Sequence, residues 1–432
     1  MTFLRVNTLP RPAQGLIQKF FFLASLQSAF FTVSGTFYVL FVLDQVGFEA
    51  LGILLAVSFI VQAVLDYPSG VLGDWIGHRW VLTISFLSYG LSYGLLVFTN
   101  SFTDLILVYV LAAFAGAQNS GAMQSWFDNN YKIATDNADP KRETYQLFQG
   151  KFQMFLGLLW GGTFIIGGLV ATLYYRGLVF AFQSIGMLFL ALICLTFVRN
   201  LPGIPKPEVS VRNYFIILGE SAKFTFFSKY AFFITLSVCI ASAAFAIWGQ
   251  MILFPMYYGY TGSDLGAAIF RFFAWLSASS TAAKAGQISG RLNIRKWLPR
   301  MQLYVIMGYF GVFALLFFIL PFDKPNFLGA ILVLIIFFFA DAGVNIWSIL
   351  RQRLFLDMIP DNIRNSYYSL LPTLTLIVSA PAVLVGGTLI ENYGTSFTLV
   401  LMMLLGWLSC FFLFAGMRLL PKGTLNGEEE EQ

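Results

Sequence analysis

Long apolar runs follow one another along nearly the whole chain, and they limit its possible folds more than any other feature. Most of them reach about 20 residues, which is the length that a helix needs to cross the hydrocarbon core of a membrane. Across the 432 residues, 58% are hydrophobic and only 11% are charged, whereas soluble globular proteins have roughly 25% charged residues. The chain has too little polar surface for a water-soluble body. We therefore expect an all-α protein that lies in a lipid bilayer.

The apolar runs predict twelve membrane-spanning helices. The first run follows basic residues, as a signal peptide does, but it is too long for one and lacks a small-residue cleavage site, so we expect it to be retained. The expected spans are residues 17–43, 48–68, 80–99, 103–127, 144–174, 177–199, 229–258, 264–286, 300–321, 326–350, 366–391 and 395–418.

One long polar break divides these helices into two groups of six. It covers residues 200–228 and opens with several Pro and Gly residues, which exclude a helix there. Its second part is basic and amphipathic, and it is either a plain tether or a helix on the cytoplasmic membrane surface. The expected parts are an N-terminal bundle (1–199), a cytoplasmic linker (200–228), a C-terminal bundle (229–418) and a disordered cytoplasmic tail (419–432) with a run of acidic residues.

The basic residues predict the orientation of the helices. If both termini are cytoplasmic, 23 of the 26 Lys and Arg residues fall in inner segments. Only Arg176 and Lys324 then lie in outer loops, and Arg271 lies within a span. This asymmetry is typical of membrane proteins. It would be lost with an odd number of spans, so it supports the count of twelve. We expect the protein in the plasma or inner membrane.

The two halves also resemble each other in sequence, which indicates an internal repeat. Three short patterns recur at offsets of 216, 219 and 222 residues, close to half the chain length. The pairs are residues 70–79 with 286–295, residues 161–168 with 380–387, and Arg142-x-x-Tyr145 with Arg364-x-x-Tyr367. Many transporters are built from two such repeats around a site near the membrane midplane.

A polar segment between the second and third expected spans carries the most specific motif. Pro68 and Gly70 are expected to end one helix, and Gly77 to permit a tight turn into the next. The pattern Gly70-x-x-x-Asp74-x-x-Gly77-x-Arg79 resembles the signature between helices 2 and 3 of the major facilitator superfamily. The resemblance implies a transporter made of two pseudo-symmetric six-helix bundles.

The same resemblance implies that this segment is a cytoplasmic latch. In the family, the loop Asp contacts the start of helix 11, and a basic residue pairs with an acid at the end of helix 4. The matching positions here are Asp74, Arg79 and Asp128. Helix N-termini carry partial positive charge, which suits the Asp contact. Trp75 and His78 stand where the family usually has basic residues, so the loop is less positive. The alternative is a turn with solvated charges.

Charged residues inside the C-terminal spans are candidates for coupling or substrate binding. Asp341 lies near the middle of the tenth expected span, and Asn345 lies one turn further on the same face. A charge at that depth costs about 2.5–3.5 kcal/mol on insertion scales, so it should face a cavity or a partner. We expect Asp341 to couple proton movement or to recognise a cation. A structural ion pair with Arg271 is the alternative, and Arg271 could instead hold an anionic substrate.

Uncharged polar residues supply further substrate-binding candidates in the N-terminal half. They are Gln27 in the first span, Asn119 in the fourth, and Gln149 and Gln153 in the fifth. Such side chains can bind a substrate or join two helices, and polar contacts between membrane helices average only about 0.6 kcal/mol. The resemblance favours cavity lining for the first and fourth helices.

The sequence offers little that would support an enzyme. It has one His, no His-Glu-x-x-His motif, no phosphate-binding Gly-rich loop followed by Lys, and three Cys residues without a common spacing. We therefore expect no catalytic residues, no metal site and no cofactor. The pI of about 9.0 follows from the membrane topology, so nucleic-acid binding is not expected.

These observations predict a secondary transporter that moves a small solute by alternating access. Proton-coupled efflux is the leading hypothesis. A metabolite or sugar importer, a uniporter, or a sensor or scaffold derived from a transporter are the alternatives. The expected partners are the small-molecule substrate, protons and the lipid bilayer, and the expected state is a monomer.

Overall fold

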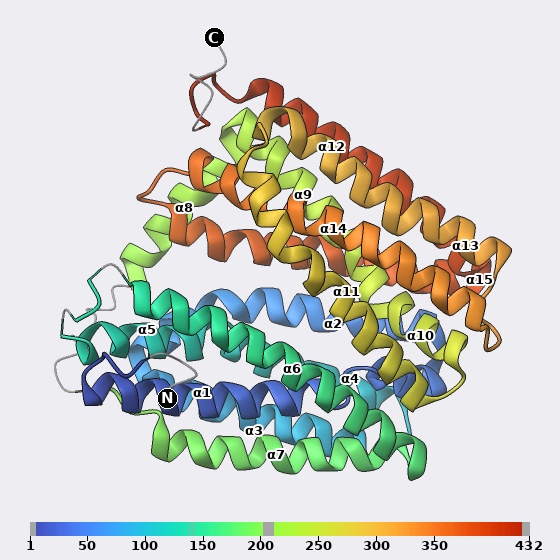
Figure 1. Cartoon of the computed structure of the whole chain (residues 1–432), viewed down its shortest axis with the longest axis horizontal. Coiled ribbons are helices and arrows are strands. Elements are labelled where there is room, and N and C mark those ends of the chain that lie inside the picture. The colour runs from blue at the N-terminus through green and yellow to red at the C-terminus, as the bar shows by residue number, and fades with distance from the viewer. Residues whose placement is uncertain (1–5, 137, 141, 202–210, 426–432) are drawn as a thin grey trace. The chain divides into compact units, whose positions relative to one another are not determined.

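The structure is a computed structural model, and it describes residues 6–136, 138–140, 142–201 and 211–425. Side chains are described in these ranges except at residues 67–75, 211–215, 217, 283 and 365. Throughout the described ranges the secondary structure is helical, with no strand (Figure 1). The expected disordered tail lies mostly outside these residues.

The chain forms two compact units. The first comprises Met1–Tyr38 and Val64–Val209, and the second comprises Val39–Ala63 and Ser210–Gln432. The division differs from the expected one mainly in one segment, because residues 39–63 pack with the C-terminal part of the chain. The boundary between the units therefore falls inside a helix as well as in the polar linker.

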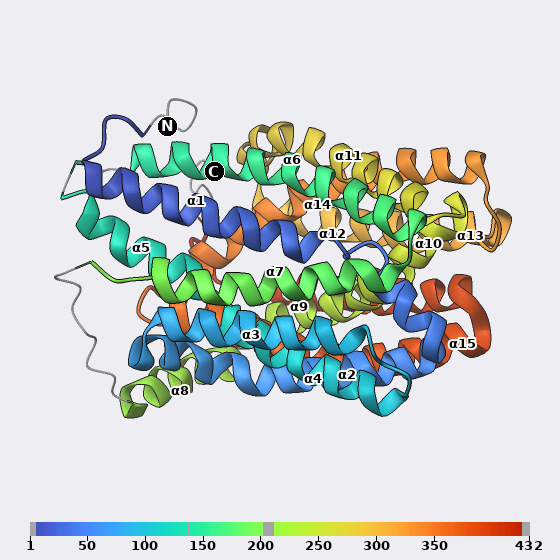
Figure 2. The ribbon, with the colours of Figure 1, turned by 90° about the horizontal axis from the view of Figure 1, so that it is seen from below.

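The first unit contains six complete helices and the second part of α2. In it, α3 packs against both α4 and α7, and α1 packs against α5, α6 and α7 (Figure 2). Its helices are α1 (Arg11–Thr32), the second part of α2 (Tyr38–Ile76), α3 (His78–Leu96), α4 (Phe102–Asn119), α5 (Ala122–Ala134), α6 (Glu143–Leu173) and α7 (Arg176–Phe197).

The second unit contains the first part of α2 and all described helices from α8 to α15. In it, α9 packs along α15, and α14 packs against α11 and α12. Its helices are α8 (Val211–Phe227), α9 (Lys229–Ile247), the π-helix η1 (Trp248–Ile252), α10 (Leu253–Thr261), α11 (Asp264–Gly290), α12 (Ile294–Ile306), the π-helix η2 (Met307–Val312), α13 (Phe313–Ile319), α14 (Phe327–Met358) and α15 (Arg364–Leu419). The linker thus contains a helix, α8.

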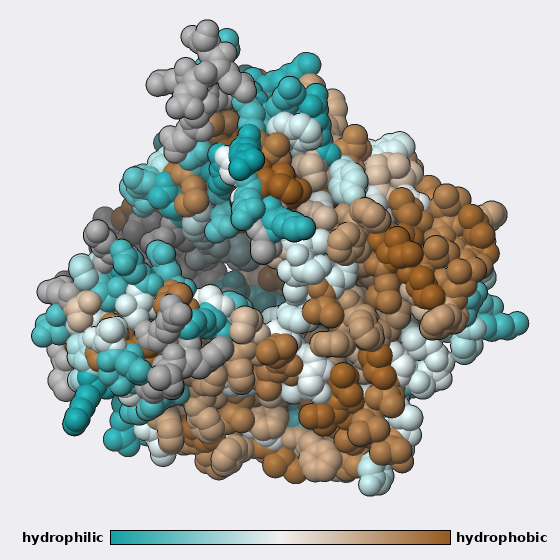
Figure 3. All heavy atoms as spheres, viewed as in Figure 1, coloured by the Kyte–Doolittle hydropathy of each residue, from teal (hydrophilic) through white to brown (hydrophobic). Residues whose placement is uncertain are grey.

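Apart from α8, these segments make up the twelve expected helices. The segments α4 and α5 form one span, and so do α9–η1–α10 and α12–η2–α13. Gly394 has φ 82° and divides α15 into two helices. In the described residues, eight stretches are long and apolar enough to cross a membrane by length and composition. Large apolar side chains also cover much of the surface that Figure 3 presents, as a lipid-facing exterior requires.

Two expected helix ends are wrong. The first span was expected to be one helix over residues 17–43, but α1 ends at Thr32 and the chain turns before helical conformation resumes at Tyr38. Gly47 (φ 71°) then divides α2 directly before residue 48, where the second span was expected to begin. Apolar composition continues through the turn after Thr32, so hydropathy does not reveal it. The second span was expected to end at Pro68 and Gly70, but α2 continues to Ile76. Membrane helices tolerate Pro because neighbouring groups satisfy the freed carbonyl.

Stacked aromatic side chains form the core of the first unit. Phe20 of α1 stacks on Phe127 of α5 with ring centroids 4.1 Å apart. Phe127 in turn lies 5.7 Å from Phe148, which stacks on Phe152 at 5.8 Å within α6. All four side chains are buried. The cluster therefore joins three helices that are distant in sequence.

A buried polar network joins four helices of the second unit. The Gln302 amide nitrogen donates to the hydroxyls of Ser237 at 3.0 Å and Ser409 at 2.5 Å. The indole nitrogen of Trp347 donates to the Gln302 amide oxygen at 3.3 Å. The Ser237 and Ser409 hydroxyls also donate to each other's backbone carbonyls, at 2.7 Å and 3.0 Å. Gln302 thus joins polar groups from α9, α14 and α15 and accepts the hydrogen bond of the Trp347 indole.

We expect the Gln302→Leu substitution to lower the free energy of unfolding by about 1–3 kcal/mol, because it leaves the buried Trp347 nitrogen without an acceptor. Thermal unfolding of the purified protein in detergent measures this effect. Gln153→Leu on the exposed face of α6 is the matched control and should change the midpoint little. Equal midpoints for the two variants would contradict the structural role of Gln302.

Candidate functional site

The acid that the sequence singles out in α14 has an aromatic partner. Asp341 is half-buried, and the Tyr309 hydroxyl donates a hydrogen bond to its Oδ1 oxygen. Tyr309 is only 7% exposed, so its position is set by packing and not by solvent. A neutral donor therefore faces the carboxylate.

Two π-helical turns position Tyr309. It lies in η2, and its ring packs edge-on against Trp248 of η1 with centroids 5.6 Å apart and planes at 87°. The Phe245 ring contacts it from the preceding turn of the same span at 5.4 Å. Single π-helical turns are frequent at functional sites. Here η2 carries Tyr309, which binds Asp341, and η1 carries Trp248, which packs against Tyr309.

Arg271, the basic candidate in the second unit, lies against an aromatic ring. The Arg271 guanidinium lies over the Phe254 ring, 4.8 Å from its centroid. Tyr257, which is buried, lies within electrostatic range of both Arg271 and Asp341. The side chain that donates a hydrogen bond to Asp341 is Tyr309.

Asn345, the second candidate on α14, joins two helices. Its amide nitrogen donates to the Ala278 carbonyl and to the Thr281 hydroxyl, both at 2.9 Å. Ala278 and Thr281 belong to α11, so Asn345 connects α14 to α11 one turn away from Asp341. The same contact orients the helix face that carries Asp341.

A second polar cluster lies in the first unit, between α5 and α6. The Tyr145 hydroxyl donates to Asp128 at 2.7 Å, and the Gln124 amide donates to Asp128 at 2.9 Å. The Gln149 amide reaches the Tyr145 hydroxyl at 3.3 Å. Asp128 thus has two neutral partners among the described residues. Gln149 binds to the same cluster.

The latch motif is only partly described. Gly70 and Asp74 lie in the last turns of α2, where no side chains are described. Gly77 follows with φ 90°, a conformation that favours glycine, and separates α2 from α3. The Arg79 guanidinium lies over the neighbouring Trp80 ring at 5.4 Å. The expected contacts of the latch stay a prediction.

The other three polar candidates of the first unit are not brought together. Gln27 of α1 is half-buried, and Gln153 of α6 is exposed. The side-chain oxygen of Asn119 at the end of α4 is buried and has no hydrogen-bond partner among the described residues. Of the three, only Asn119 thus has an unsatisfied polar atom inside the protein.

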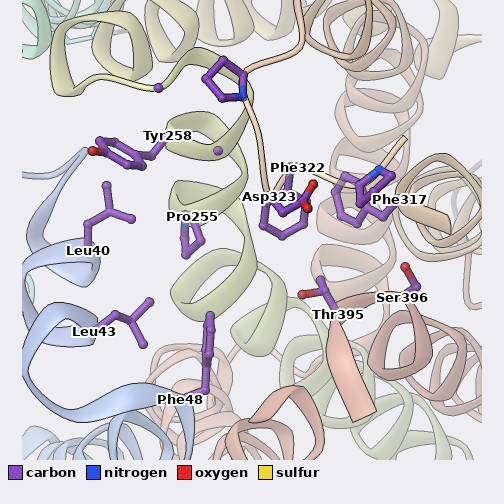
Figure 4. Close-up of a pocket in the computed structure, with 14 residues that line it drawn as sticks. Leu40, Leu43, Phe48, Pro255, Tyr258, Phe317, Phe322, Asp323, Thr395 and Ser396 are labelled. Atoms are coloured by element: carbon purple, nitrogen blue, oxygen red, sulfur yellow. The ribbon is translucent and has the colours of Figure 1, made fainter. Parts of the chain in front are cut away.

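A pocket of about 550 Å³ lies in the second unit, away from Asp341 (Figure 4). Leu40, Leu43 and Phe48 of α2 form one wall. Pro255 and Tyr258 of α10 form another. Apolar side chains dominate its lining, and Asp323, Thr395 and Ser396 add the polar atoms. Sequence reasoning did not predict this pocket.

The carboxylate of Asp139 organises the loop between α5 and α6. It accepts hydrogen bonds from the Tyr131 hydroxyl at 2.8 Å and from the backbone N–H groups of Tyr145 at 2.9 Å and Thr144 at 3.2 Å. Burial acts to raise the pKa of Asp139, but these hydrogen bonds outweigh it and hold the pKa below its usual value. Asp139 therefore caps α6 as an anion.

Sequence reasoning missed Tyr309, Tyr145 and Asp139. A single tyrosine is not distinctive in a chain in which 18% of residues are aromatic. Asp139 lies in a polar loop, where an acid is ordinary. The one available signal was the order of residues around the start of α6, since an acid shortly before a helix is a common N-terminal cap.

The arrangement is that of a helical membrane transporter with a few polar residues inside apolar bundles. The sequence matches the Major Facilitator Superfamily over residues 20–371. The chain belongs to this family, and it is a transporter and not an enzyme. No curated protein matches it in sequence.

Solved structures with the same fold are distant in sequence. The nucleoside transporter NupG is 13% identical, with a TM-score of 0.71 over 95% of this chain and 99% of that chain. A bacterial homolog of the human lysosomal transporter Spinster, inward-facing and occupied, is 15% identical, with a TM-score of 0.70 over 94% of this chain and 96% of that chain. A D-xylose–proton symporter is 12% identical, with a TM-score of 0.67 over 97% and 99% of the two chains. These similarities confirm the fold.

We expect Asp139→Asn to lower the unfolding temperature at pH 7 and to have no effect at acidic pH. The pKa of Asp139 is lower in the folded state, so its contribution is complete above the unfolded pKa of about 3.9 and disappears as the pH falls through the folded pKa. Thermal unfolding from pH 7 to pH 3 measures the difference between the variants. Asp136→Asn, at an exposed neighbouring acid, is the control. A difference that does not become smaller between pH 7 and pH 3 would contradict the assignment.

Proposed function

We propose that this transporter moves a small solute across the cell membrane by alternating access, with proton movement coupled through Asp341. The observation that carries the proposal is the surroundings of Asp341. Asp341 is half-buried in a membrane-spanning helix, and it accepts a hydrogen bond from the neutral hydroxyl of Tyr309. A charge in such a segment is costly, and binding of a proton removes it.

Asp341 and Tyr309 together form a group that can hold and release one proton. The deprotonated carboxylate accepts the hydrogen bond from Tyr309. When a proton binds to the carboxylate, the hydroxyl no longer faces a negative charge, and the two side chains can rearrange. A proton taken up on one side of the membrane and released on the other couples the gradient to the conformational change.

Arg271 is the residue that we assign to an anionic or strongly polar group of the substrate. Arginine stays protonated in proteins, and its planar guanidinium suits carboxylate and phosphate groups. Tyr257, which is buried, interacts electrostatically with both Arg271 and Asp341. Substrate binding at Arg271 and proton binding at Asp341 can therefore influence each other through one side chain.

The distribution of basic residues supports an orientation with both termini in the cytoplasm. The latch residues Gly70, Asp74 and Arg79 then lie on the cytoplasmic side. We keep the proposal that Asp74 stabilises the N-terminal turn of the eleventh helix when the inner side is closed. Breaking such a contact would be one half of a two-state switch.

Efflux driven by the proton gradient is the version that we put forward. Uptake of a metabolite or sugar is the second candidate, and it is favoured by the fold similarity to a D-xylose–proton symporter. In both versions the roles of Asp341 and Tyr309 are the same, and flux measurements in the two directions separate them. A non-transporting sensor would bind a ligand and show no flux.

We expect Asp341→Asn to abolish the response of transport to an imposed pH gradient while the protein still inserts and folds. Asparagine has nearly the same shape as aspartate but binds no proton in this range. The measurement is uptake of a ligand, found by a thermal-shift screen, into liposomes with and without a pH gradient. Asp136→Asn, at an exposed acid after α5, is the control with the same chemical change. A pH-driven flux that survives in Asp341→Asn would refute the coupling role.

We expect Arg271→Gln to weaken binding of the ligand about tenfold or more if the ligand is anionic, because a charge-assisted hydrogen bond is lost. Titration calorimetry or thermal shift with the purified protein measures the affinity. Lys324→Gln is the control for loss of a positive charge. An unchanged affinity for every anionic ligand of the wild-type protein would remove Arg271 from the binding site.

A further inference from the structure

The pocket shown in Figure 4 has the size and the lining of a small-molecule site. Its volume of about 550 Å³ lies within the usual range of about 300–1,000 Å³ for such sites. Its walls are mainly apolar, with a few polar side chains, as is typical of ligand pockets. Asp341 and Arg271 are not among its described lining residues. The pocket is therefore separate from the site to which we assign transport.

One wall of the pocket is held by contacts between α10 and the segment after α13. The Tyr260 hydroxyl donates to the Leu320 carbonyl at 2.6 Å, and the Asn326 backbone N–H donates to the Tyr260 carbonyl at 3.0 Å. A Cβ atom on Gly259 would overlap the Phe322 carbonyl oxygen, so the two backbones touch. Phe322, which lines the pocket, is thus held in position by the protein itself.

A second wall is fixed at the break in α2. Gly47 has φ 71° and ψ 178°, so Phe48 begins a new helical segment whose first N–H groups lack intrahelical acceptors. The Phe48 N–H donates to the Oε2 oxygen of Glu391 in α15 at 2.8 Å, and an anion at such a helix start is stabilising. A Cβ atom on Gly387 would overlap the Phe48 carbonyl oxygen. The pocket is thus formed without a ligand, which lowers the cost of binding one.

Three polar side chains of the pocket are available to a ligand. Asp323, Thr395 and Ser396 lie on one side of the close-up in Figure 4, and Leu40 and Leu43 lie on the other side. Asp323 is exposed, and the two hydroxyl residues are half-buried. Within the part of the chain that the structure describes, none of the three side chains makes a hydrogen bond or an ion pair. They offer one carboxylate and two hydroxyl groups to a ligand.

These acceptors suit a primary ammonium group. Such a group has three N–H donors and no acceptor, so one carboxylate and two hydroxyl oxygens can satisfy it. A bound calcium ion takes six to eight oxygen ligands, commonly with several carboxylates, and the described residues contain no group of three His, Cys, Asp or Glu side chains that could hold a metal. An anion would be repelled by Asp323. The polar side of the pocket therefore favours a cation with N–H donors.

Exposed aromatic residues next to the pocket indicate where its ligand comes from. Phe318, four residues before the pocket residue Phe322, is 80% exposed, and Tyr393, close to Thr395 in sequence, is 65% exposed. Exposed aromatic side chains are typical of the membrane and its interface. With both termini in the cytoplasm, as we propose, this end of the second unit lies on the outer side. A ligand with an apolar chain can therefore reach the pocket from the outer leaflet.

We propose that this pocket binds an amphiphile with a primary ammonium head group and an apolar chain, taken from the outer leaflet of the membrane. The ammonium group binds at Asp323, Thr395 and Ser396, and the chain packs against the apolar side chains of α2 and α10. The head group can belong to a membrane lipid or to a free lipophilic amine. This inference goes beyond the proposed transport function and does not depend on proton coupling.

The test measures binding of radiolabelled decylamine to the purified full chain in phosphatidylcholine nanodiscs, with binding to empty nanodiscs subtracted. We expect saturable binding of one molecule per chain. Asp323→Asn removes the charge of the pocket and should weaken the affinity about fivefold, as expected for a solvent-screened ion pair. Asp136→Asn makes the same chemical change at an exposed acid outside the pocket and should bind as wild type does.

Competition with unlabelled compounds separates the head group from the chain. Wild type should bind decylamine more tightly than decanol, and decanoate most weakly. Leu43→Trp fills the apolar part of the pocket and should weaken binding of decylamine and decanol alike, whereas Asp323→Asn should weaken binding of decylamine only. Leu173→Trp, at an exposed position of α6, is the matched control for the added indole. If Leu43→Trp does not fold, the comparison of decylamine with decanol in Asp323→Asn still decides.

Two further measurements identify the source of the ligand and separate this pocket from the proposed coupling site. Competition by phosphatidylethanolamine in the nanodiscs would identify a lipid head group, and its absence a free amine. Asp341→Asn should bind decylamine as wild type does, even where its pH-driven flux is lost. Loss of binding in Asp341→Asn would place the amine at Asp341 and overturn the proposal. Equal affinities of wild type and Asp323→Asn, or of decylamine and decanol, would also overturn it.

Discussion

The structure depends on the need to satisfy every backbone polar group inside hydrocarbon, where water offers no hydrogen bonds. Helices meet this need along their length, but at each helix end several backbone N–H or C=O groups have no partner within the helix. In the second unit, polar side chains take up several of them. Ser263, Asn293 and Asn326 each accept a backbone N–H at the start of a helix, at 3.0 Å, 3.2 Å and 3.1 Å. Arg295 donates to the Met417 carbonyl at the end of α15 at 2.7 Å.

The same requirement explains why a carboxylate appears at Gly47, far from any chain terminus. A break within a helix creates a new start, and Glu391 supplies the acceptor from another helix. The anionic cap of α6 by Asp139 is the equivalent within one loop. In both places, the helix end and its partner must stay together, so a conformational change at either place requires a replacement partner such as water.

The number and positions of the helices could be predicted from sequence, because hydropathy and the asymmetry of basic residues report directly on the membrane. Helix ends could be predicted less well. Hydropathy does not reveal the turn between Thr32 and Tyr38, because the turn is as apolar as the helices. Pro68 does not end α2, because a membrane helix accommodates a proline. A glycine such as Gly47 has no distinguishing neighbours in the sequence, and its role becomes apparent only next to Glu391.

Asp341 could be found from sequence because an ionisable residue in an apolar run is rare and costly. Its partner could not, since Tyr309 is 32 residues away and its direction depends on two π-helical turns. Such a turn inserts about one residue beyond the regular repeat, which rotates the following helix by about 100°. Residues before and after η1, and before and after η2, therefore do not share a face at ordinary helical spacing. An alignment of this chain with a relative that lacks these turns would be out of register by one position along α10 and α13, and it would assign the wrong side chains to the interior.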